Sequence, residues 1–337
     1  SFCQASRRDW LSYWLTLQPK VAMKNFQAGM AADVRKSARL DKRGRVASGW
    51  DMRCFLLLCW LLGCAPGMVH ALPSVPDAPA EDALNLYCLR LSYPAVSALE
   101  RDGDGAQWLV LADGRRVLYS RGRAELQADP WNVDVRTSMA DLYPLEPERP
   151  ATPSGVAPGR RRSYALLAAL YGADAGEVGR GLHTALLLGQ PVRMAKAAAL
   201  ALRKVEPLLA EAVREEPGLR GLLKSDGGFL WRRVAGEQRL SPHAYGVALD
   251  LSARRAPYWR WSRLRPHPMQ QSYPPAIVTA FESQGFIWGG KWHEYDLMHF
   301  EYRPELICKA RILRGLEKMN AAGFETGGAT GEMEPRP

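Results

Sequence analysis

Apolar residues recur at helical spacing in two stretches of the second half of the chain. Between residues 205 and 213, Leu208 included, they fall on one helical face, and Pro217-Gly218 marks the end of that helix. A shorter pattern around Phe281 predicts another helix that ends at Gly285, since glycine readily adopts the left-handed conformation that closes helices. We interpret both stripes as core-facing, because an amphipathic helix buries its apolar side.

Other stretches show the two-residue period of strands. Trp108–Tyr119 predicts a β-hairpin that turns at Asp113-Gly114, a dipeptide that accepts the positive φ of such turns. Two short strand-like runs, 247–251 and 298–302, lie among the helices. The pattern therefore predicts an α+β fold in which a small sheet, flanked by helices, contains these two runs.

Composition divides the chain further. Residues 72–83 are rich in Pro, Ala and Asp and predict a linker, and 144–162 predict a second loop or boundary. From about residue 323 the Gly/Glu/Pro-rich sequence predicts a disordered tail. The expected organisation is an N-terminal region with a linker and a hairpin at 72–160, a main domain at 161–322, and the tail at 323–337.

A targeting segment is predicted at residues 52–71. Met52-Arg53 precedes a short apolar run that ends in Val69-His70-Ala71, a pattern typical of a secretory signal peptide cleaved after Ala71. The run is too short to cross a membrane comfortably, so no transmembrane domain is expected in the mature protein. Leu61-Leu-Gly-Cys64 also resembles a bacterial lipoprotein box, in which Cys64 would bear a lipid anchor. We expect a periplasmic or extracellular protein, with soluble export favoured over a membrane-tethered lipoprotein.

Residues 1–51 precede this signal, and we expect them to be an upstream leader outside the mature protein. They also explain most of the net charge of +10, since they hold ten Lys/Arg against four Asp/Glu. From residue 72 onward there are 34 basic and 31 acidic residues. The charge therefore does not indicate a nucleic-acid partner.

The cysteines are consistent with export. Four of the six precede residue 72, which leaves Cys88 and Cys308. An even pair in an oxidising compartment is compatible with a disulfide between the beginning and the end of the mature chain. Two unrelated buried thiols are the alternative, because sequence does not show proximity.

Candidate chemistry lies in two motifs, Ser241-Pro-His-Ala-Tyr-Gly-Val-Ala-Leu-Asp250 and Asp296-Leu-Met-His-Phe-Glu301. His243, Asp250 and His299 offer two imidazoles and one carboxylate, a set suited to one zinc ion with an open position for water. On the strand at 247–251, alternation sends three apolar side chains into the core and Asp250 with Ala248 to the other face. Gly246 suits a turn that brings His243 beside Asp250.

Asp296 has the wrong parity to share a face with His299 on a strand. It is therefore expected in the turn before that strand, where a carboxylate can act as a general base. Four tryptophans also gather in this part of the chain. They either line a peptide or glycan groove or fill the core, and the core is the favoured interpretation. They are Trp259, Trp261, Trp288 and Trp292.

The two motifs resemble the zinc peptidases of family M15, especially the branch of D-alanyl-D-alanine carboxypeptidases and L-alanyl-D-glutamate endopeptidases. The pattern Ser-x-His-x-x-Gly-x-Ala-x-Asp, followed by Asp-x-Met-His-Phe-Glu, is matched at every specified position. The resemblance is strong over 225–306 and thin over 84–224. It implies a Hedgehog/DD-peptidase-like fold and a zinc peptidase domain at 161–322.

The resemblance also implies roles for single residues. His243, Asp250 and His299 would bind Zn²⁺, and Asp296 would accept a proton from zinc-activated water. An arginine before the first ligand would hold a substrate carboxylate or carbonyl oxygen. Arg232 is the first choice for this role and Arg239 the second, with plain surface charge as the alternative. Ser241 would help to position the substrate or cap a turn.

The implied substrates are peptidoglycan stem peptides, with D-alanyl-D-alanine carboxypeptidase activity as the first choice. Cleavage at L-alanyl-D-glutamate or at a cross-bridge is an alternative, and so is a non-catalytic, zinc-stabilised cell-wall binding module. Asp296 favours an enzyme, because a purely structural metal site needs no base. His293-Glu294 departs from the aromatic-His sequence common in relatives, which leaves the fine specificity open.

Overall fold

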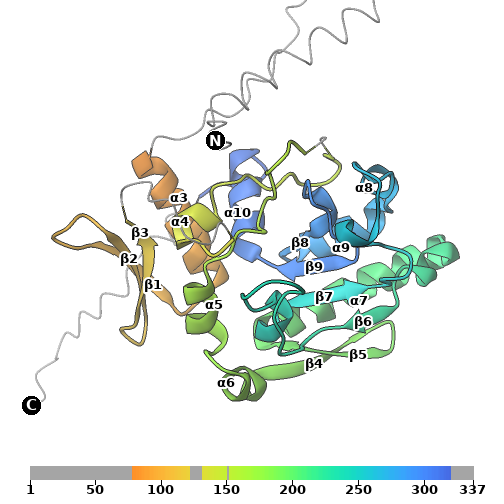
Figure 1. Cartoon of the computed structure of the whole chain (residues 1–337), viewed down its shortest axis with the longest axis horizontal. Coiled ribbons are helices and arrows are strands. Elements are labelled where there is room, and N and C mark those ends of the chain that lie inside the picture. The colour runs from red at the N-terminus through yellow and green to blue at the C-terminus, as the bar shows by residue number, and fades with distance from the viewer. Residues whose placement is uncertain (1–77, 122–130, 150–151, 320–337) are drawn as a thin grey trace, which may run out of the picture. The chain divides into compact units, whose positions relative to one another are not determined.

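The computed structural model describes residues 78–121, 131–149 and 152–319 (Figure 1). The predicted leader, the signal peptide with Cys64, residues 72–77 of the predicted linker and the predicted tail lie outside these ranges. The described residues all belong to one compact unit. Among the described residues, no helix is both long and apolar enough to cross a membrane.

A four-stranded antiparallel sheet lies at the centre of the ligand-bearing half, in the order β6-β7-β9-β8. The two predicted strand-like runs are the neighbours β7 (Ala248–Leu251) and β9 (His299–Tyr302), flanked by β6 (Ser225–Gly227) and β8 (Phe286–Trp288). The α+β class with a small antiparallel sheet is confirmed. Asp250 pairs directly with His299 across the two central strands.

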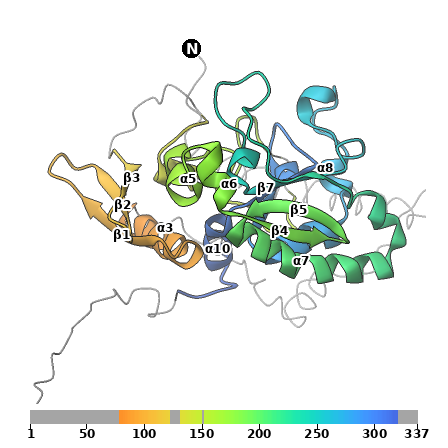
Figure 2. The same cartoon turned by 90° about the horizontal axis from the view of Figure 1, so that it is seen from below.

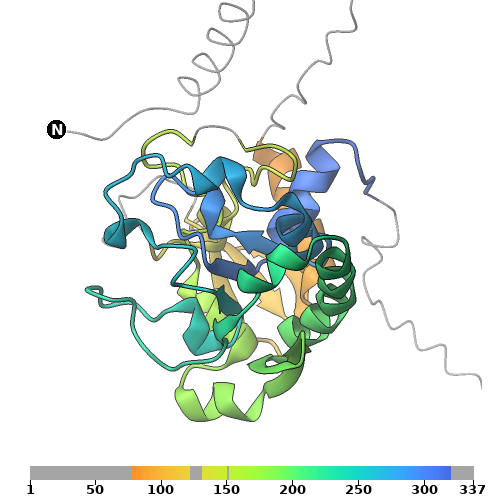
Figure 3. The same ribbon diagram turned by 90° about the vertical axis from the view of Figure 1, so that its right-hand side faces the viewer.

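Helices α7 (Lys196–Glu215) and α9 (Pro275–Ser283) share a hydrophobic core with this sheet (Figure 3). Both predicted helices are confirmed, and Gly285 has the expected positive φ of 87°. The expected position of Leu208 is wrong, since its side chain is 44% exposed. The other predicted positions are buried as expected, and Ala198 and Leu202 extend the core-facing side toward the beginning of α7; the confirmed positions are Val205, Leu209, Ala212 and Val213.

A β-hairpin precedes α7 and was not predicted. Its strands β4 (Leu182–Leu187) and β5 (Gln190–Ala195) lie alongside α7 (Figure 2). The alternation of Ala185, Leu187, Val192 and Met194, all buried, is the signal that would have revealed it.

The N-terminal part contains a three-stranded sheet of β1 (Val96–Arg101), β2 (Gln107–Leu111) and β3 (Arg116–Ser120). The last two strands confirm the hairpin at Asp113-Gly114. The linker expected at 72–83 is wrong from residue 78 onward, because helix α3 (Ala78–Ser92) begins there. Its tertiary contacts, which local composition does not reveal, stabilise the helix.

Helix α3 packs beside the last described helix, α10 (Pro304–Leu313), in a second hydrophobic core. Cys88 of α3 and Cys308 of α10 form a disulfide with a Cα–Cα distance of 5.6 Å. Of the two alternatives left by the sequence, the structure therefore selects the disulfide. The N-terminal region is joined to the end of the ligand-bearing half by this bond and this core.

Between β3 and β4 the chain forms three helices, α4 (Val135–Ser138), α5 (Tyr164–Tyr171) and α6 (Ala175–Arg180), among the residues described there. Short helical turns complete the fold at η1 (Pro217–Gly221), η2 (Pro242–Tyr245), η3 (Trp259–Trp261), α8 (Met269–Ser272) and η4 (Gly289–Lys291).

The described residues of the predicted loop, 144–149 and 152–162, form no helix or strand, but part of this segment is packed into the protein. Gly159 has a φ of 81°, and a Cβ atom there would lie 2.8 Å from Leu306 Cδ1. Arg303 donates to its carbonyl oxygen at 2.8 Å. A glycine is therefore needed where the chain passes close to α10. The next three residues are arginines, of which Arg162 reaches Glu301 on β9, whereas Arg161 pairs with Asp141.

Candidate metal centre

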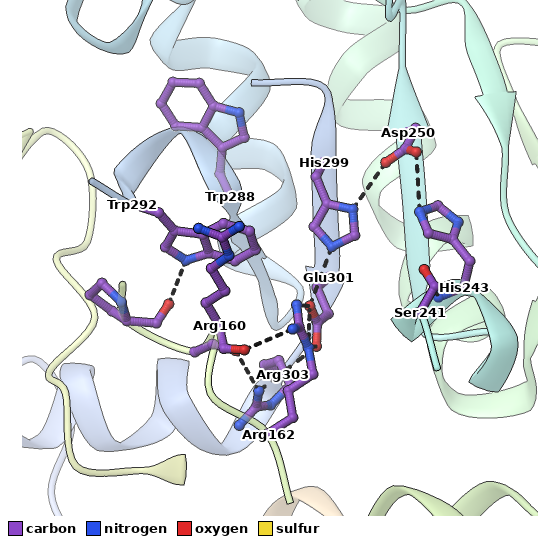
Figure 4. A network of polar contacts seen from close by, with 12 residues as sticks. Arg160, Arg162, Ser241, His243, Asp250, Trp288, Trp292, His299, Glu301 and Arg303 are labelled. Carbon is purple, nitrogen blue, oxygen red and sulfur yellow. Dashed lines mark hydrogen bonds and ion pairs between the residues drawn. The ribbon is translucent and has the colours of Figure 1, made fainter. Parts of the chain in front are cut away.

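Three side chains from separate elements meet at one point (Figure 4). His243 lies on η2, Asp250 on β7 and His299 on β9, and one ligand atom from each lies within 4.8 Å of the others. Asp250 stands between the two rings, with Oδ2 3.1 Å from His243 Nε2 and Oδ1 3.0 Å from His299 Nδ1. The structure thus brings together the ligand set that the motifs predicted.

Local sequence explains how His243 reaches this position. The Ser241 hydroxyl accepts the His243 N–H and caps the short turn η2. Gly246 ends the turn with a φ of 67°, and a Cβ atom there would lie only 2.7 Å from Ala195 N. The chain therefore reverses at Gly246 and enters β7, which places His243 beside Asp250 as expected.

The alternation along β7 also places Asp250. Val247, Leu249 and Leu251 are buried as predicted. Ala248, predicted on the same face as Asp250, is fully buried as well. Asp250 alone on this strand is partly accessible, and its cross-strand pairing with His299 sets the separation of the two side chains.

Hydrogen bonds orient both imidazole rings. His243 Nδ1 lies 2.7 Å from the Gly228 carbonyl oxygen, which can only accept, so Nδ1 bears a hydrogen. His299 Nε2 lies 3.3 Å from the Glu301 carboxylate. Each ring therefore turns its other nitrogen toward Asp250, the arrangement found when a metal-binding histidine donates its second N–H to an oxygen. The donor set fits a divalent metal with three protein ligands.

The electrostatics are those of a site prepared for a cation. Burial alone would raise the pKa of Asp250, but the adjacent His243 and His299 rings hold it well below its usual range. Burial would lower the pKa of His299, yet hydrogen bonds to Asp250 and Glu301 raise it to about 10. Both shifts share one cause, the contact of one carboxylate with two imidazole rings, and carboxylate and imidazole groups are donors that divalent metals accept.

Asp296 lies where the parity argument placed it, in the turn before β9. His299 N donates to its backbone oxygen, and its backbone pairs with that of Tyr258. Burial, followed by the charge of Asp250, raises the pKa of Asp296 to about 6, although His299 opposes this shift. Its Oδ1 is buried and has no hydrogen-bond partner in the described part of the chain. A carboxylate with a pKa near neutrality and a free oxygen has the properties of a general base.

Residues 235–302 match a protein-family model described as D-alanyl-D-alanine carboxypeptidase. This segment is therefore similar to the M15 peptidases. The match confirms the resemblance found in the two motifs and supports a peptidase with peptidoglycan-related substrates. No curated protein and no solved structure matches the chain. The M15 segment includes all three candidate ligands and Asp296.

The predicted arginines occupy different surroundings. Arg232 is exposed, and its backbone oxygen accepts the Ser241 N–H. The Arg239 side chain is only 7% exposed and pairs with Glu237. Its Nη1 is buried and finds no partner among the residues that the structure describes. Of the two arginines, the structure therefore places Arg239 in a buried setting with an unused donor.

A third arginine near the ligands, Arg160, was not predicted. Its guanidinium lies 4.9 Å from the centre of the Trp131 ring and 5.6 Å from that of Trp292. The Trp292 ring is in turn 5.7 Å from that of His299. Arg239 contacts the other ring of this group, since its guanidinium lies 5.2 Å from the Trp131 centre. Two arginines thus share Trp131 beside the M15 ligands.

Arg162 and Glu301 are two further site residues to which sequence reasoning gave no role. Arg162 binds the Glu301 carboxylate, which contacts His299 (Figure 4). Glu301 was visible as the last residue of the second motif. The signal for Arg162 was weaker, a run of three arginines after Gly159 in a segment interpreted as a loop.

The tryptophans divide between the two interpretations. Trp288 and Trp292 are buried, which confirms them as core residues, and Trp259 is half-buried. Trp261 is 66% exposed, so the core interpretation is wrong for this residue. It lies on η3, in a loop whose beginning pairs with the backbone of Asp296 through Tyr258.

Proposed function

We propose that this chain is an exported zinc peptidase that hydrolyses peptidoglycan stem peptides, with D-alanyl-D-alanine carboxypeptidase activity first. The observation that carries the proposal is the convergence of His243, Asp250 and His299 beside Asp296, all within the M15 segment. Two imidazoles and one carboxylate with a remaining open position are typical of catalytic zinc. When bound, zinc supplies a Lewis acid that activates water and polarises a carbonyl group.

Asp296 acts as the general base in this proposal. Its raised pKa of about 6 leaves it ionised at neutral pH, yet basic enough to accept a proton and return it to the departing amine. Its unpartnered Oδ1 is available for this transfer. A non-catalytic cell-wall binding module would need no such group, so Asp296 favours the enzyme.

In this proposal Arg239, which lies beside Trp131, binds the free carboxylate of the substrate. A carboxypeptidase must hold the terminal carboxylate of its peptide, and guanidinium groups bind carboxylates through paired, charge-assisted hydrogen bonds. Arg239 has an unused buried donor, whereas Arg232 is exposed. We therefore assign this role to Arg239, with Arg160 close by. Ser241 is buried and its hydroxyl accepts the His243 N–H, which supports turn capping over substrate contact.

Export is supported by the cysteines and by the signal-like sequence at 52–71. The Cys88–Cys308 disulfide suits an oxidising compartment such as the periplasm or the extracellular space. The same compartment contains the proposed substrate. A lipid anchor at Cys64 remains the alternative to soluble export.

A digest of purified muropeptides by the full chain, analysed by mass spectrometry together with metal analysis, tests the proposal. Released D-alanine and one bound zinc per chain are the expected result. Products cut between L-alanine and D-glutamate, or at a cross-bridge, would move the activity to another bond. Bound zinc without any product would leave the binding module as the function.

A further inference from the structure

We propose that Arg162 is a positioning residue of the metal centre, which acts through Glu301 to hold His299 in its metal-binding orientation. The inference rests on the proposed metal site and extends it beyond the M15 segment, since Arg162 lies outside residues 235–302. It requires no assumption about which peptide bond is cut.

Glu301 is the first link of this chain of contacts. It follows His299 by two residues on β9, so both side chains leave the same face of the strand. Its side chain is fully buried, and its Oε2 lies 3.3 Å from His299 Nε2. The contact leaves Nδ1 of the same ring facing Asp250 at 3.0 Å. Because Glu301 accepts from one nitrogen, it determines which nitrogen is left for a metal.

Arg162 holds Glu301 in turn. Arg162 Nε lies 2.8 Å from Oε1 and 3.1 Å from Oε2, and Nη2 also contacts Oε2. Two nitrogens of a planar guanidinium on one carboxylate fix the plane of that carboxylate as well as its position. The remaining terminal nitrogen, Nη1, donates to the Arg160 carbonyl oxygen at 2.7 Å, so the guanidinium is itself anchored.

No other cation in the described part of the chain holds Glu301 in this way. Arg303 Nη1 is 3.8 Å from Oε1, beyond hydrogen-bonding distance. Arg303 is already bound to Glu305 at 2.6 Å and to the Gly159 carbonyl oxygen at 2.8 Å. Arg162 is therefore the residue whose loss would free the Glu301 carboxylate to turn away from His299.

The backbone of Arg162 explains why a residue so distant in sequence is held here. Arg162 N donates to the Trp131 carbonyl oxygen, and Val133 N donates to the Arg162 carbonyl oxygen. The backbone of Arg162 is thus hydrogen-bonded to that of Trp131 and Val133, and its side chain extends toward Glu301 on β9. Its path is set by Gly159, which passes close to Leu306.

The zinc affinity of the full chain tests this inference. The dissociation constant is measured by competition with a chromophoric chelator for the wild type, Arg162→Lys and Glu301→Gln. Lysine at position 162 retains the positive charge but does not place two nitrogens on the carboxylate. Glutamine at position 301 retains the size of the side chain, but its neutral amide oxygen is a weaker hydrogen-bond acceptor than a carboxylate oxygen. Both variants should bind zinc about 10- to 100-fold more weakly than the wild type, the effect typical of outer contacts to a metal ligand.

Lys309→Met is the matched control. Lys309 on α10 forms a buried ion pair with Glu81 on α3, at 3.0 Å. Replacement of Lys309 therefore disturbs a comparable buried pair outside the metal centre. This variant should lose thermal stability but retain the zinc affinity of the wild type. A similar loss of affinity in Lys309→Met would show that Arg162 acts only through general stability.

Near-UV circular dichroism at saturating zinc establishes which variants are folded. If Arg162→Lys does not fold, Glu301→Gln decides alone, since it alters the same contact without a change of volume. Wild-type zinc affinity in a folded Glu301→Gln variant would overturn the inference. Wild-type protein that binds zinc but cleaves no muropeptide would refute the peptidase proposal and leave this test intact.

Discussion

Residues 241–301 and residues 152–162 meet at the same candidate metal centre, but their sequences specify this in different ways. The first stretch supplies ligands from two motifs, and adjacent strands β7 and β9 place Asp250 opposite His299 by register alone. The second stretch supplies Arg160 and Arg162, whose positions depend on packing against Trp131, β9 and α10. Ligand identity is thus local in sequence, whereas ligand orientation depends on distant residues.

Removal of a candidate ligand should weaken zinc binding more than any change in the second stretch. Asp250→Ala should weaken zinc binding by more than the roughly 100-fold expected for loss of an outer contact, and hydrolysis should disappear. The reason is that Asp250 contacts both His rings and supplies the only carboxylate of the cluster. Chelator competition measures the affinity. Asp174→Asn, which retains the cap of α6, serves as control, and unchanged zinc binding in Asp250→Ala would place the metal elsewhere.

Replacement of the base should separate metal binding from turnover. Asp296→Asn should lower kcat/KM for a stem peptide by about 10²- to 10⁴-fold, because the amide does not accept the proton. The zinc content should not change, since Asp296 is not one of the three ligands. Steady-state kinetics and metal analysis of the same preparation test both points. Full activity in this variant would remove Asp296 from the mechanism.

Loss of the disulfide should affect stability rather than the site. The double variant Cys88→Ser, Cys308→Ser should lose about 2–5 kcal/mol of unfolding free energy, since the bond closes a long loop of the chain. Urea denaturation measures this loss, and chelator competition should give wild-type zinc affinity. Weakened zinc binding in the folded double variant would show that α3 and α10 influence the ligands more directly than we infer.

The two predicted arginines should differ in their effect on substrate binding. Arg239→Lys should raise KM for a peptide with a free terminal carboxylate by about tenfold or more, since one charge-assisted hydrogen bond contributes roughly 1.5–3 kcal/mol. Arg232→Lys is the matched control and should leave KM within error, because its side chain is exposed. With a peptide amide, which lacks the terminal carboxylate, the KM values of Arg239→Lys and the wild type should differ less. A larger increase of KM in Arg232→Lys than in Arg239→Lys would show that Arg232 binds the substrate carboxylate.

The pH profile should show the smallest but most specific effect. The pKa of Asp296 is raised to about 6, so the base is ionised above that value and becomes protonated as the pH falls through it. Activity should therefore be present at neutral pH and fall about tenfold per pH unit on the acidic side. A bound cation lowers the pKa of a neighbouring carboxylate, which places the midpoint at or below 6. The residual activity of Asp296→Asn should not show this fall on the acidic side of the profile.

Much of the fold could be predicted where a pattern lies within one element. The stripes of α7 and α9, the strands β7 and β9 and the hairpin at Asp113-Gly114 follow from local periodicity and turn residues. Helix α3 was mistaken in part for a linker, because its stability comes from α10 and the disulfide rather than from a clear local signal.

The sequence by itself determined the candidate ligands His243, Asp250 and His299, because two motifs encode the turn and the strand positions on which they lie. The pairing of β7 with β9 then brings Asp250 opposite His299. The sequence also determined the turn position of Asp296, through the parity of β9. Only the tertiary structure decided that Arg239 rather than Arg232 has a buried, unused donor, and that Arg162 holds Glu301 behind His299. Such contacts join residues more than a hundred positions apart, and no local pattern specifies them because they depend on how separate elements pack.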